Sequence, residues 1–353
     1  MIHDILREDA ERIWQRVPPE KLRDKTFLIL GSNGLIGTQL VVAVYVANQT
    51  LGLNARVIGI SRNPPNDTLR GLADDARLVF HHQDLATDFQ CNEKADFAFH
   101  GATYGQPRKF LEDPLGTIRL NTYLTEKLLE YCARHDTAML FASSAFVYGQ
   151  PGPEHIPTPE TYNGNLSTTA PRAAYGESKR LGETICSIFR DRKKLDVTIA
   201  RISETYGPGL SLNNDSRAIG DFLRQALTTK RVHMLDAGHQ RRAWCYVSDC
   251  AAMLLNIMLQ GQDFIYNVGG RNPVSIRDLA ELICRLTGAT LELPKEETGR
   301  LALGADHVEL DLTRLMSEFK NCADLIPVQE GLRRVVQWNR DAALPALHSV
   351  AVP

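Results

Sequence analysis

Tyr175 and Lys179 are the two residues whose types and spacing suggest acid–base chemistry. They stand in the run Tyr-Gly-Glu-Ser-Lys at the start of a predicted helix, and their four-residue separation puts both side chains on one helix face. A tyrosine is a poor base near neutrality because its pKa is about 10. An adjacent ammonium favours the phenolate and lowers that pKa, so Tyr175 can take a proton from a hydroxyl while hydride leaves the same carbon.

Ser144 adds a hydroxyl to this pair. It belongs to the run Phe-Ala-Ser-Ser-Ala-Phe-Val-Tyr-Gly, which begins at Phe141 and reads as a strand that ends in hydroxyls. Ligands of α/β proteins bind at the carboxyl ends of such strands. We therefore expect Ser144 to share a hydrogen bond with the reacting oxygen; the alternative is that it only caps the strand end.

A glycine-rich turn supplies the expected cofactor site. The strand Thr26–Leu30 runs into Gly-Ser-Asn-Gly-Leu-Ile-Gly and then into an apolar helix, which is the context that gives such a motif meaning. The first glycine allows the tight turn, the second lets backbone N–H groups approach a pyrophosphate, and the third lets helix and strand pack closely. The turn predicts a bound nicotinamide dinucleotide, whose nicotinamide ribose Lys179 would hold. Its cofactor-binding residues are Gly31, Asn33, Gly34, Leu35, Ile36 and Gly37.

The end of the second predicted strand, Ile-Ser-Arg-Asn, bears on which dinucleotide is bound. NAD-binding proteins place an acidic residue there for the two ribose hydroxyls, and this run has no carboxylate. A hydroxyl followed by a guanidinium suits a 2′-phosphate, because arginine supplies charge-assisted and bidentate hydrogen bonds. Ser61 and Arg62 therefore favour NADP over NAD, whereas a solvated Arg62 would leave NAD as the alternative.

The elements that must position these residues follow from hydrophobic patterning. Short apolar runs alternate with helical patterns as far as residue 201, which predicts a parallel sheet with helices on both faces. The predicted strands are Thr26–Leu30, Arg56–Ile60, Leu78–His82, Phe97–His100, Ala138–Ser143 and Val197–Arg201. The predicted helices are Leu35–Ala47, Thr117–His135 and Tyr175–Arg190. We expect an α/β fold, a Rossmann-type doubly wound parallel sheet with a smaller C-terminal substrate-binding lobe.

This pattern divides the chain into three parts. Residues 1–24 read as an amphipathic helical extension, residues 25–204 as the NAD(P)-binding Rossmann domain, and residues 205–353 mainly as the substrate-binding lobe. Part of 244–269 is expected to return to the Rossmann domain. The segment from Gln150 to Pro171 is too long for a plain connection, so we expect a functional or surface-wrapping loop.

Together, these motifs resemble the extended short-chain dehydrogenases/reductases of the NAD-dependent epimerase/dehydratase family. The spacing G-x-x-G-x-x-G is that of the short-chain class rather than of two-domain dehydrogenases. The resemblance runs from Lys25 to about Arg285 and rests on GSNGLIG, FHGAT, the helix containing Asn121, SSAFVYG, YGESK, RISETYGPG, RRAWCYVSD and YNVGG. It implies a nucleotide-sugar substrate, with the nucleotide in the C-terminal lobe and the sugar between Ser144, Tyr175 and the nicotinamide.

The resemblance also extends both sites residue by residue. Near the adenine and the centre of the cofactor it implies Asp84, Leu85, Gly101, Ala102, Thr103 and Asn121. On the substrate side it implies Tyr104, Ser144, Ala145, Phe146, Glu204 and Arg242. Arg242 matches an arginine that binds the substrate diphosphate, for which its fork geometry is suited. The alternative is that Arg242 is one of two adjacent surface arginines.

Two departures from the family's pattern bear on the reaction. Nucleotide-sugar 4,6-dehydratases carry an Asp-Glu pair where this chain has Ala145 and Phe146, neither of which can transfer a proton. UDP-glucuronate decarboxylases keep a Glu where Phe146 stands, although GATYGQPRKFLEDPLGTIRLNT and NGNLSTTAPRAAYGESKR resemble their segments. Glu204 stands where related enzymes often have Asn, and it either binds sugar hydroxyls or an amino substituent, or forms a structural ion pair.

These departures favour a nucleotide-sugar oxidoreductase that acts at C4, as a 4-epimerase or a 4-dehydrogenase/ketoreductase. The alternatives within the family are a UDP-glucuronate decarboxylase-like enzyme and a nucleotide-sugar dehydratase. From another class, the chain could be a catalytically silent NADP-binding regulatory homologue. Such a homologue would not need Ser144, Tyr175 and Lys179 together, and all three are present.

Composition narrows the partners and the compartment. The 40 Lys and Arg residues nearly balance the 42 Asp and Glu residues, so no overall field draws the protein to nucleic acid or to membranes. Seven scattered cysteines without a C-x-x-C pair fit a reducing compartment and predict no metal site. No window approaches the roughly 20 apolar residues of a membrane span, so we expect a cytoplasmic protein. The resemblance implies a homodimer that pairs through Thr117–His135 and Tyr175–Arg190.

Overall fold

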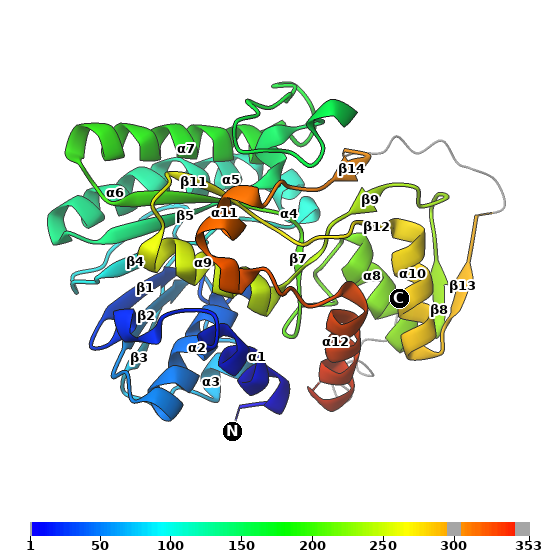
Figure 1. The fold of residues 1–353 in the computed structure, drawn as a ribbon, viewed down its shortest axis with the longest axis horizontal. Helices are drawn as coiled ribbons and strands as arrows, with labels where there is room; N and C mark the ends of the chain where they lie inside the picture. The colour runs from blue at the N-terminus through cyan, green and yellow to red at the C-terminus, as the bar shows by residue number, and fades with distance from the viewer. Residues whose placement is uncertain (1, 295–304, 343–353) are drawn as a thin grey trace.

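A seven-stranded parallel sheet forms the centre of the molecule (Figure 1). The computed structural model describes residues 2–294 and 305–342. The strand order is β11-β6-β5-β4-β1-β2-β3. The strands are β1 (Thr26–Leu30), β2 (Arg56–Ser61), β3 (Leu78–His82), β4 (Phe97–His100), β5 (Ala138–Ser144), β6 (Val197–Ile202) and β11 (Ile265–Val268). The predicted fold class is confirmed, and each predicted strand lies within one residue of its observed bounds.

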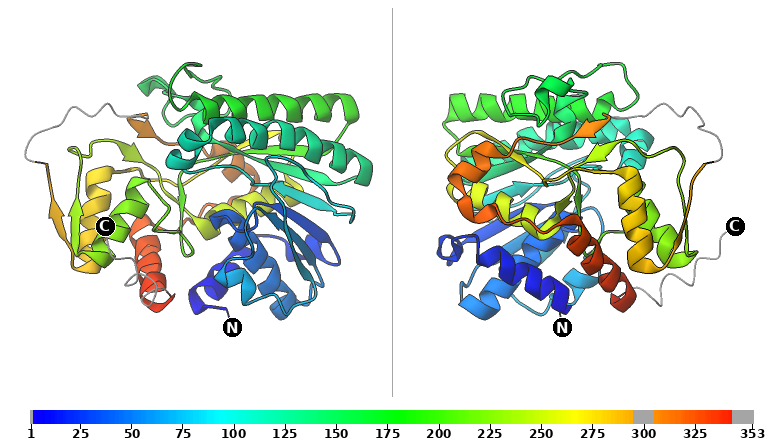
Figure 2. Two further views of the ribbon diagram at one scale, coloured as in Figure 1. Left: turned by 180° about the vertical axis from the view of Figure 1, so that it is seen from behind. Right: turned by 45° about the vertical axis from the view of Figure 1, so that its right-hand side comes forward.

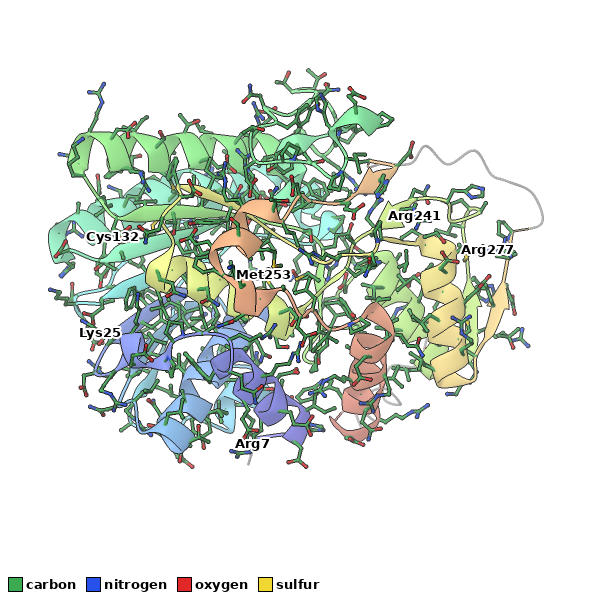
Figure 3. All side chains as sticks on the ribbon, viewed as in Figure 1. Arg7, Lys25, Cys132, Arg241, Met253 and Arg277 are labelled. Atoms are coloured by element: carbon green, nitrogen blue, oxygen red, sulfur yellow. The ribbon has the colours of Figure 1, made fainter. Side chains whose placement is uncertain are left out.

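Two apolar cores cover the two faces of the sheet, because the strands are near-continuous apolar runs buried on both sides. On one face lie α1 (Asp4–Trp14), α2 (Leu35–Leu51) and α9 (Val247–Gln260). On the other lie α5 (Pro114–Asn121), α6 (Tyr123–His135) and α7 (Ala173–Lys193). Figure 3 labels one fully buried residue of each core, Met253 in α9 and Cys132 in α6.

The predicted helix Thr117–His135 is in fact two helices, α5 and α6, separated at Thr122. Thr122 has φ −122° and ψ −70°, outside the helical region. Helix α7 approaches closely at the break, since a Cβ on Gly182 would stand 2.6 Å from the carbonyl oxygen of Asn121. That oxygen accepts a hydrogen bond of 2.8 Å from the hydroxyl of Thr125. Helical periodicity alone does not reveal such a break.

The C-terminal lobe is built from α8 (Ala218–Thr228), α10 (Ile276–Thr287) and α12 (Val328–Ala342), which share a third apolar core. Figure 2 shows this lobe set to one side of the sheet. Its short strands are β7 (Thr205–Tyr206), β8 (Arg231–His233), β9 (Arg241–Arg242), β10 (Cys245–Tyr246), β12 (Val274–Ser275), β13 (Thr290–Glu292) and β14 (His307–Val308). The remaining elements are η1 (Pro19–Leu22), α3 (Asp67–Arg70), α4 (Pro107–Glu112), η2 (Ala145–Tyr148), η3 (Pro153–His155), α11 (Thr313–Glu318) and η4 (Lys320–Cys322).

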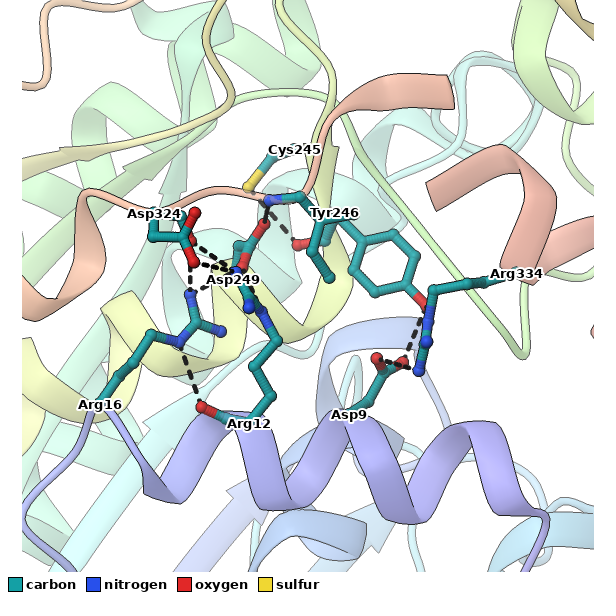
Figure 4. Close-up of polar contacts among 9 residues, drawn as sticks. Asp9, Arg12, Arg16, Cys245, Tyr246, Asp249, Asp324 and Arg334 are labelled. Carbon is teal, nitrogen blue, oxygen red and sulfur yellow. Dashed lines mark hydrogen bonds and ion pairs between the residues drawn. The ribbon is translucent and has the colours of Figure 1, made fainter. Parts of the chain in front are cut away.

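Buried charges tie the N-terminal helix α1 to α9, β10 and α12 (Figure 4). Arg16 donates to Asp249 at 2.7 Å, and Asp9 accepts from both Tyr246 (2.8 Å) and Arg334 (3.0 Å). Burial raises the pKa of Asp9 to about 6, against the opposing effect of the Arg334 guanidinium. The contacts anchor the N-terminal extension to both the sheet and the lobe. Among residues 2–294 and 305–342, no helix is long and apolar enough to cross a membrane.

Candidate active site

A cleft of about 1190 Å³ opens at the carboxyl ends of the strands and is closed on its far side by the C-terminal lobe. It brings the glycine turn, the ends of β2 and β4, Ser144, Tyr175, Glu204 and Arg242 around one space. Two of the predicted site residues, Asn121 and Lys179, are not on its wall. Both are buried behind it, and Asn121 donates to the hydroxyl of Ser178 at 2.9 Å.

The glycine turn fits a dinucleotide pyrophosphate. Gly31 has φ +86°, and a Cβ there would lie 2.9 Å from the backbone of Gly101. A Cβ on Gly37 would lie 2.3 Å from the carbonyl oxygen of Gly31, so neither glycine can be replaced without moving backbone. Gly34 is the N-cap of α2 and provides no side-chain cap, which leaves the first N–H groups of that helix directed at the cleft as an anion site.

Ser61 and Arg62, on which the NADP prediction depends, both have partners within the protein. The hydroxyl of Ser61 accepts from the backbone N–H of Asn33 at 3.0 Å, so it helps to hold the glycine turn. Arg62 donates to the hydroxyl of Tyr104 at 2.6 Å, and its guanidinium lies 5.1 Å from the centre of that ring. Because β1 lies between β2 and β4, this contact passes over the end of β1, where the glycine turn begins. Tyr104 thus lies in the cleft wall near the glycine turn.

Tyr175 lies buried at the start of α7 between two phenylalanine rings. Phe110 stacks on it with ring centres 4.9 Å apart, and Phe146 meets it edge-on at 5.4 Å. Burial raises the pKa of Tyr175, while a hydrogen bond with Ser144 and the charge of Arg217 act in the opposite direction. The predicted Ser144–Tyr175 pair is therefore brought together, in an apolar setting.

Lys179 lies one turn further along α7, buried against strand β5. Its ammonium donates to the carbonyl oxygen of Ala142 at 2.5 Å and lies 4.7 Å from the centre of the Phe141 ring. Burial lowers the pKa of Lys179 to about 7. The ammonium donates to strand β5, and the effects that oppose burial of Tyr175 come from Ser144 and Arg217, so the expected lowering of the Tyr175 pKa by Lys179 stays a prediction.

On the substrate side, Arg242 and Glu204 form an ion pair. The Nε atom of Arg242 lies 3.1 Å from the carboxylate of Glu204, and both residues line the cleft. Of the two interpretations of Glu204, the structure shows the ion pair. Arg242 stays in the cleft wall, and its Nη1 atom donates to the backbone carbonyl oxygens of Arg241 (2.8 Å) and Asp306 (3.3 Å).

Arg172 is a cleft residue that sequence reasoning missed. It is the N-cap of α7, three residues before Tyr175, and it is half-buried. Its Nε atom is buried without a hydrogen-bond partner among the described residues. Burial lowers the pKa of Arg172, and the nearby Arg242 acts in the same direction against Glu204. Its place at the start of α7, three residues before Tyr175, was the available signal.

Comparisons with known proteins agree with this arrangement. Residues 27–269 match the family model described as "NAD dependent epimerase/dehydratase family". The chain is 30% identical to UDP-glucuronic acid decarboxylase 1 of Xenopus tropicalis, over 92% of this chain and 76% of that protein. The Danio rerio protein of the same name is 26% identical over 96% of this chain and 79% of that protein. The chain therefore belongs to the NAD-dependent epimerase/dehydratase family, as its motifs predicted.

Solved structures share the fold at lower identity. A UDP-glucuronic acid 4-epimerase from Bacillus cereus, in complex with NAD, has a TM-score of 0.71 at 20% identity, with 90% of this chain and 96% of that chain covered. A dTDP-glucose 4,6-dehydratase from Streptomyces venezuelae, with NAD bound, has a TM-score of 0.75 at 21% identity, with 90% and 97% covered. These neighbours contain NAD, and nothing in the comparisons supports the NADP preference. The curated relatives favour the decarboxylase alternative over the 4-epimerase.

Proposed function

We propose that this chain is an NAD-dependent enzyme that oxidises C4 of UDP-glucuronic acid, after which the sugar loses its carboxyl group as carbon dioxide. The relatives named above support the substrate and the reaction. The observation that carries the proposal is Arg172. It lies in the wall of the same cleft as Tyr175, and its Nε has no partner among the described residues; a guanidinium there suits a carboxylate on the substrate, because Arg pairs with carboxylates in a charge-assisted, bidentate geometry.

NAD is the cofactor that the cleft favours. The turn from Gly31 to Gly37 would hold its pyrophosphate, and residues from the ends of β2, β3 and β4 would hold its adenosine half. Arg62, paired with Tyr104, is engaged within the protein rather than held open for a 2′-phosphate. When bound, NAD+ supplies the hydride acceptor. We also propose that residues 25–204, together with α9 and β11, form the cofactor-binding part and that most of the rest binds the nucleotide sugar.

The side chains divide the remaining work. Tyr175 takes the proton of the C4 hydroxyl, and Ser144 donates a hydrogen bond to the same oxygen. Lys179 keeps its ammonium close behind them, where positive charge favours the phenolate once the tyrosine has lost its proton. Arg242 binds the diphosphate in this proposal and is oriented by Glu204.

Phe146 does not prevent decarboxylation. Oxidation at C4 makes the C6 carboxylate part of a β-keto acid, in which the electrons of the broken C5–C6 bond pass into the ketone. The resulting enolate then takes a proton at C5. This sequence needs no acid to protonate a leaving hydroxyl at C6, which the Asp-Glu pair of dehydratases provides. An apolar ring near the carboxylate also disfavours the charged acid relative to neutral carbon dioxide.

C4 epimerisation of the same substrate is the second candidate, and Ala145 with Phe146 is the observation that favours it. Returning hydride to the other face of the ketone needs no proton donor besides Tyr175. The two reactions differ in carbon count, so product mass separates them.

The test is to incubate the purified chain with NAD+ and a panel of UDP-sugars in deuterated water, with products examined by mass spectrometry and NMR. We expect UDP-glucuronic acid to give a UDP-pentose or its 4-ketone, lower in mass by carbon dioxide and deuterated at C5. UDP-galacturonic acid would establish the second candidate instead. Turnover of UDP-glucose alone, or of no sugar, would refute the proposed substrate.

A further inference from the structure

The end of strand β5 contacts helix α7 at three places beside the cleft. Three consecutive residues of β5, 142–144, contact three positions of α7 that lie successive turns apart, Tyr175, Lys179 and Glu183. Positions four and eight residues apart share one helix face, so these three side chains form a row. The first two belong to the proposed catalytic set. The third, Glu183, has no role in the function as proposed above.

Glu183 is held from two sides at the bottom of this row. One of its carboxylate oxygens accepts a hydrogen bond of 2.5 Å from the hydroxyl of Ser143, the residue before Ser144. Arg201 on β6 reaches both oxygens, at 3.0 Å through Nε and at 2.7 Å through Nη2. Arg201 also donates to the hydroxyl of Tyr148, in η2, at 3.1 Å. The carboxylate thus joins α7 to the end of β5, to β6 and to the turn that follows Ser144.

A buried ion pair is a poor way to gain stability, because the cost of removing two charges from water offsets most of their attraction. The side chains of Glu183 and Arg201 are each only 11% exposed. Apolar side chains of similar volume would pack this position at no such cost. A contribution to stability therefore does not explain why a carboxylate is buried at position 183.

The carboxylate of Glu183 affects the protonation of Lys179, one turn away on the same helix. The Lys179 ammonium is fully buried, and burial lowers its pKa to about 7, whereas Cys186 and, next, the carboxylate of Glu183 raise it. The other titratable groups around it are Tyr175 on the same helix, Arg201 behind Glu183, and His100 at the end of β4. His100 is neutral there, because burial and the charge of Lys179 lower its pKa to about 3. Without Glu183, Lys179 would lose the carboxylate that favours its charged form.

We propose that Glu183 is a positioning residue: its bond to Ser143 aligns Ser144 with Tyr175, and its carboxylate, one turn along α7 from Lys179, favours the charged form of that amine. The inference rests on the proposed roles of Tyr175 and Lys179 but not on the identity of the substrate. According to this proposal, the buried ion pair of Glu183 and Arg201 affects the reaction and not only folding.

The test compares Glu183→Gln with the wild-type enzyme in two measurements. The first is the pH titration of the Lys179 side chain by NMR of lysine-labelled protein, with its signal assigned from Lys179→Met. Loss of a neighbouring opposite charge is expected to move the midpoint from near 7 to about one unit lower. The second is the pH profile of kcat. If Lys179 must be charged, that shift costs about fivefold in rate at pH 7 and almost nothing at pH 5.

Arg190→Gln is the matched control. Arg190 lies on the same helix and donates to the carbonyl oxygen of Val197 on β6 at 2.8 Å, so its loss also loosens α7 from the sheet. We expect Arg190→Gln to lower Tm and to leave the titration of Lys179 in place. Ser143→Ala retains the carboxylate, and we expect it to lower kcat severalfold without moving the pH profile.

Coincident titrations of Lys179 in Glu183→Gln and wild type would overturn the proposal. If Glu183→Gln does not fold, Glu183→Asp replaces it: the retained charge is expected to keep the Lys179 midpoint, and a shift as large as one unit would contradict the inference. Failure of wild type to turn over UDP-glucuronic acid would refute the proposed function alone, since the NMR titration needs no substrate.

Discussion

Replacing Arg172 by Gln tests whether this side chain binds the carboxylate of the substrate. The substitution keeps a polar side chain of similar length and removes the guanidinium. A hydrogen bond to a charged group contributes about 1.5–3 kcal/mol to binding. Because Arg172 is half-buried, solvent screening favours the lower half of that range, about 1.5–2 kcal/mol. That corresponds to a roughly 10- to 30-fold weaker affinity for a carboxylate ligand.

The assay measures the dissociation constants of UDP-glucuronic acid and of UDP-glucose, which differ only at C6, by calorimetry with the NAD-loaded protein. We expect Arg172→Gln to weaken UDP-glucuronic acid by the factor above and UDP-glucose by less than about threefold. Lys109→Gln removes another positive charge from the wall of the same cleft and serves as the control. It should affect both ligands equally and slightly.

Two results would refute this reasoning. Equal weakening of both ligands by Arg172→Gln would place the guanidinium on the diphosphate, which the two sugars share. Unchanged binding of UDP-glucuronic acid would remove Arg172 from the substrate site altogether. In either case the structural argument for a uronic acid would be lost, and only the similarity to the decarboxylases would remain.

Three further predictions address the base, the core and the assembly. Tyr175→Phe should lower hydride transfer by about a hundredfold or more while leaving the amount of bound NAD unchanged, and activity within a few-fold of wild type would exclude Tyr175 as the base. His100 stays neutral down to about pH 3 in the folded protein but takes up a proton near pH 6.5 when unfolded, so the free energy of unfolding should fall by up to about 1.4 kcal/mol per pH unit below pH 6.5. Denaturant titrations at several pH values should show that the free energy of unfolding of His100→Gln depends less steeply on pH than that of wild type. An equal dependence on pH would contradict this. Leu115 on α5 and Leu181 on α7 are 62% and 51% exposed, so we expect a dimer that pairs through these helices. The substitution Leu181→Glu should dissociate the dimer. A monomer mass for wild type in light scattering at micromolar concentration would contradict this prediction.

The sequence predicted the sheet and most of the cleft for a physical reason. Strands buried on both faces must be apolar along their length, so β1, β2 and β4 stand out, and the polar residues that follow them meet at one edge of a parallel sheet. Ser144 and the glycine turn were found in this way, whereas Tyr175 was found from its four-residue spacing to Lys179 on a predicted helix.

What the sequence did not show depends on contacts between distant residues. The pairing of Arg62 with Tyr104 joins the ends of two strands that flank a third, and no spacing along the chain reveals it. Burial raises the pKa of Tyr175, and the rings of Phe110 and Phe146 that pack on it come from other parts of the chain. Arg172 escaped notice because an arginine at a helix start usually faces solvent, and only the folded cleft shows that its Nε is buried.

The central claim is that C4 oxidation in this cleft is followed by loss of C6. UDP-glucuronic acid carrying carbon-13 at C6 tests it most directly, with the reaction followed by carbon NMR in a sealed tube containing the protein and NAD+. The account predicts that the labelled carboxylate signal disappears and that the carbon dioxide and bicarbonate formed together contain all of the lost label. Tyr175→Phe should abolish this conversion. A labelled carboxylate that persists on the sugar, as unreacted substrate or as its C4 epimer, would contradict the account.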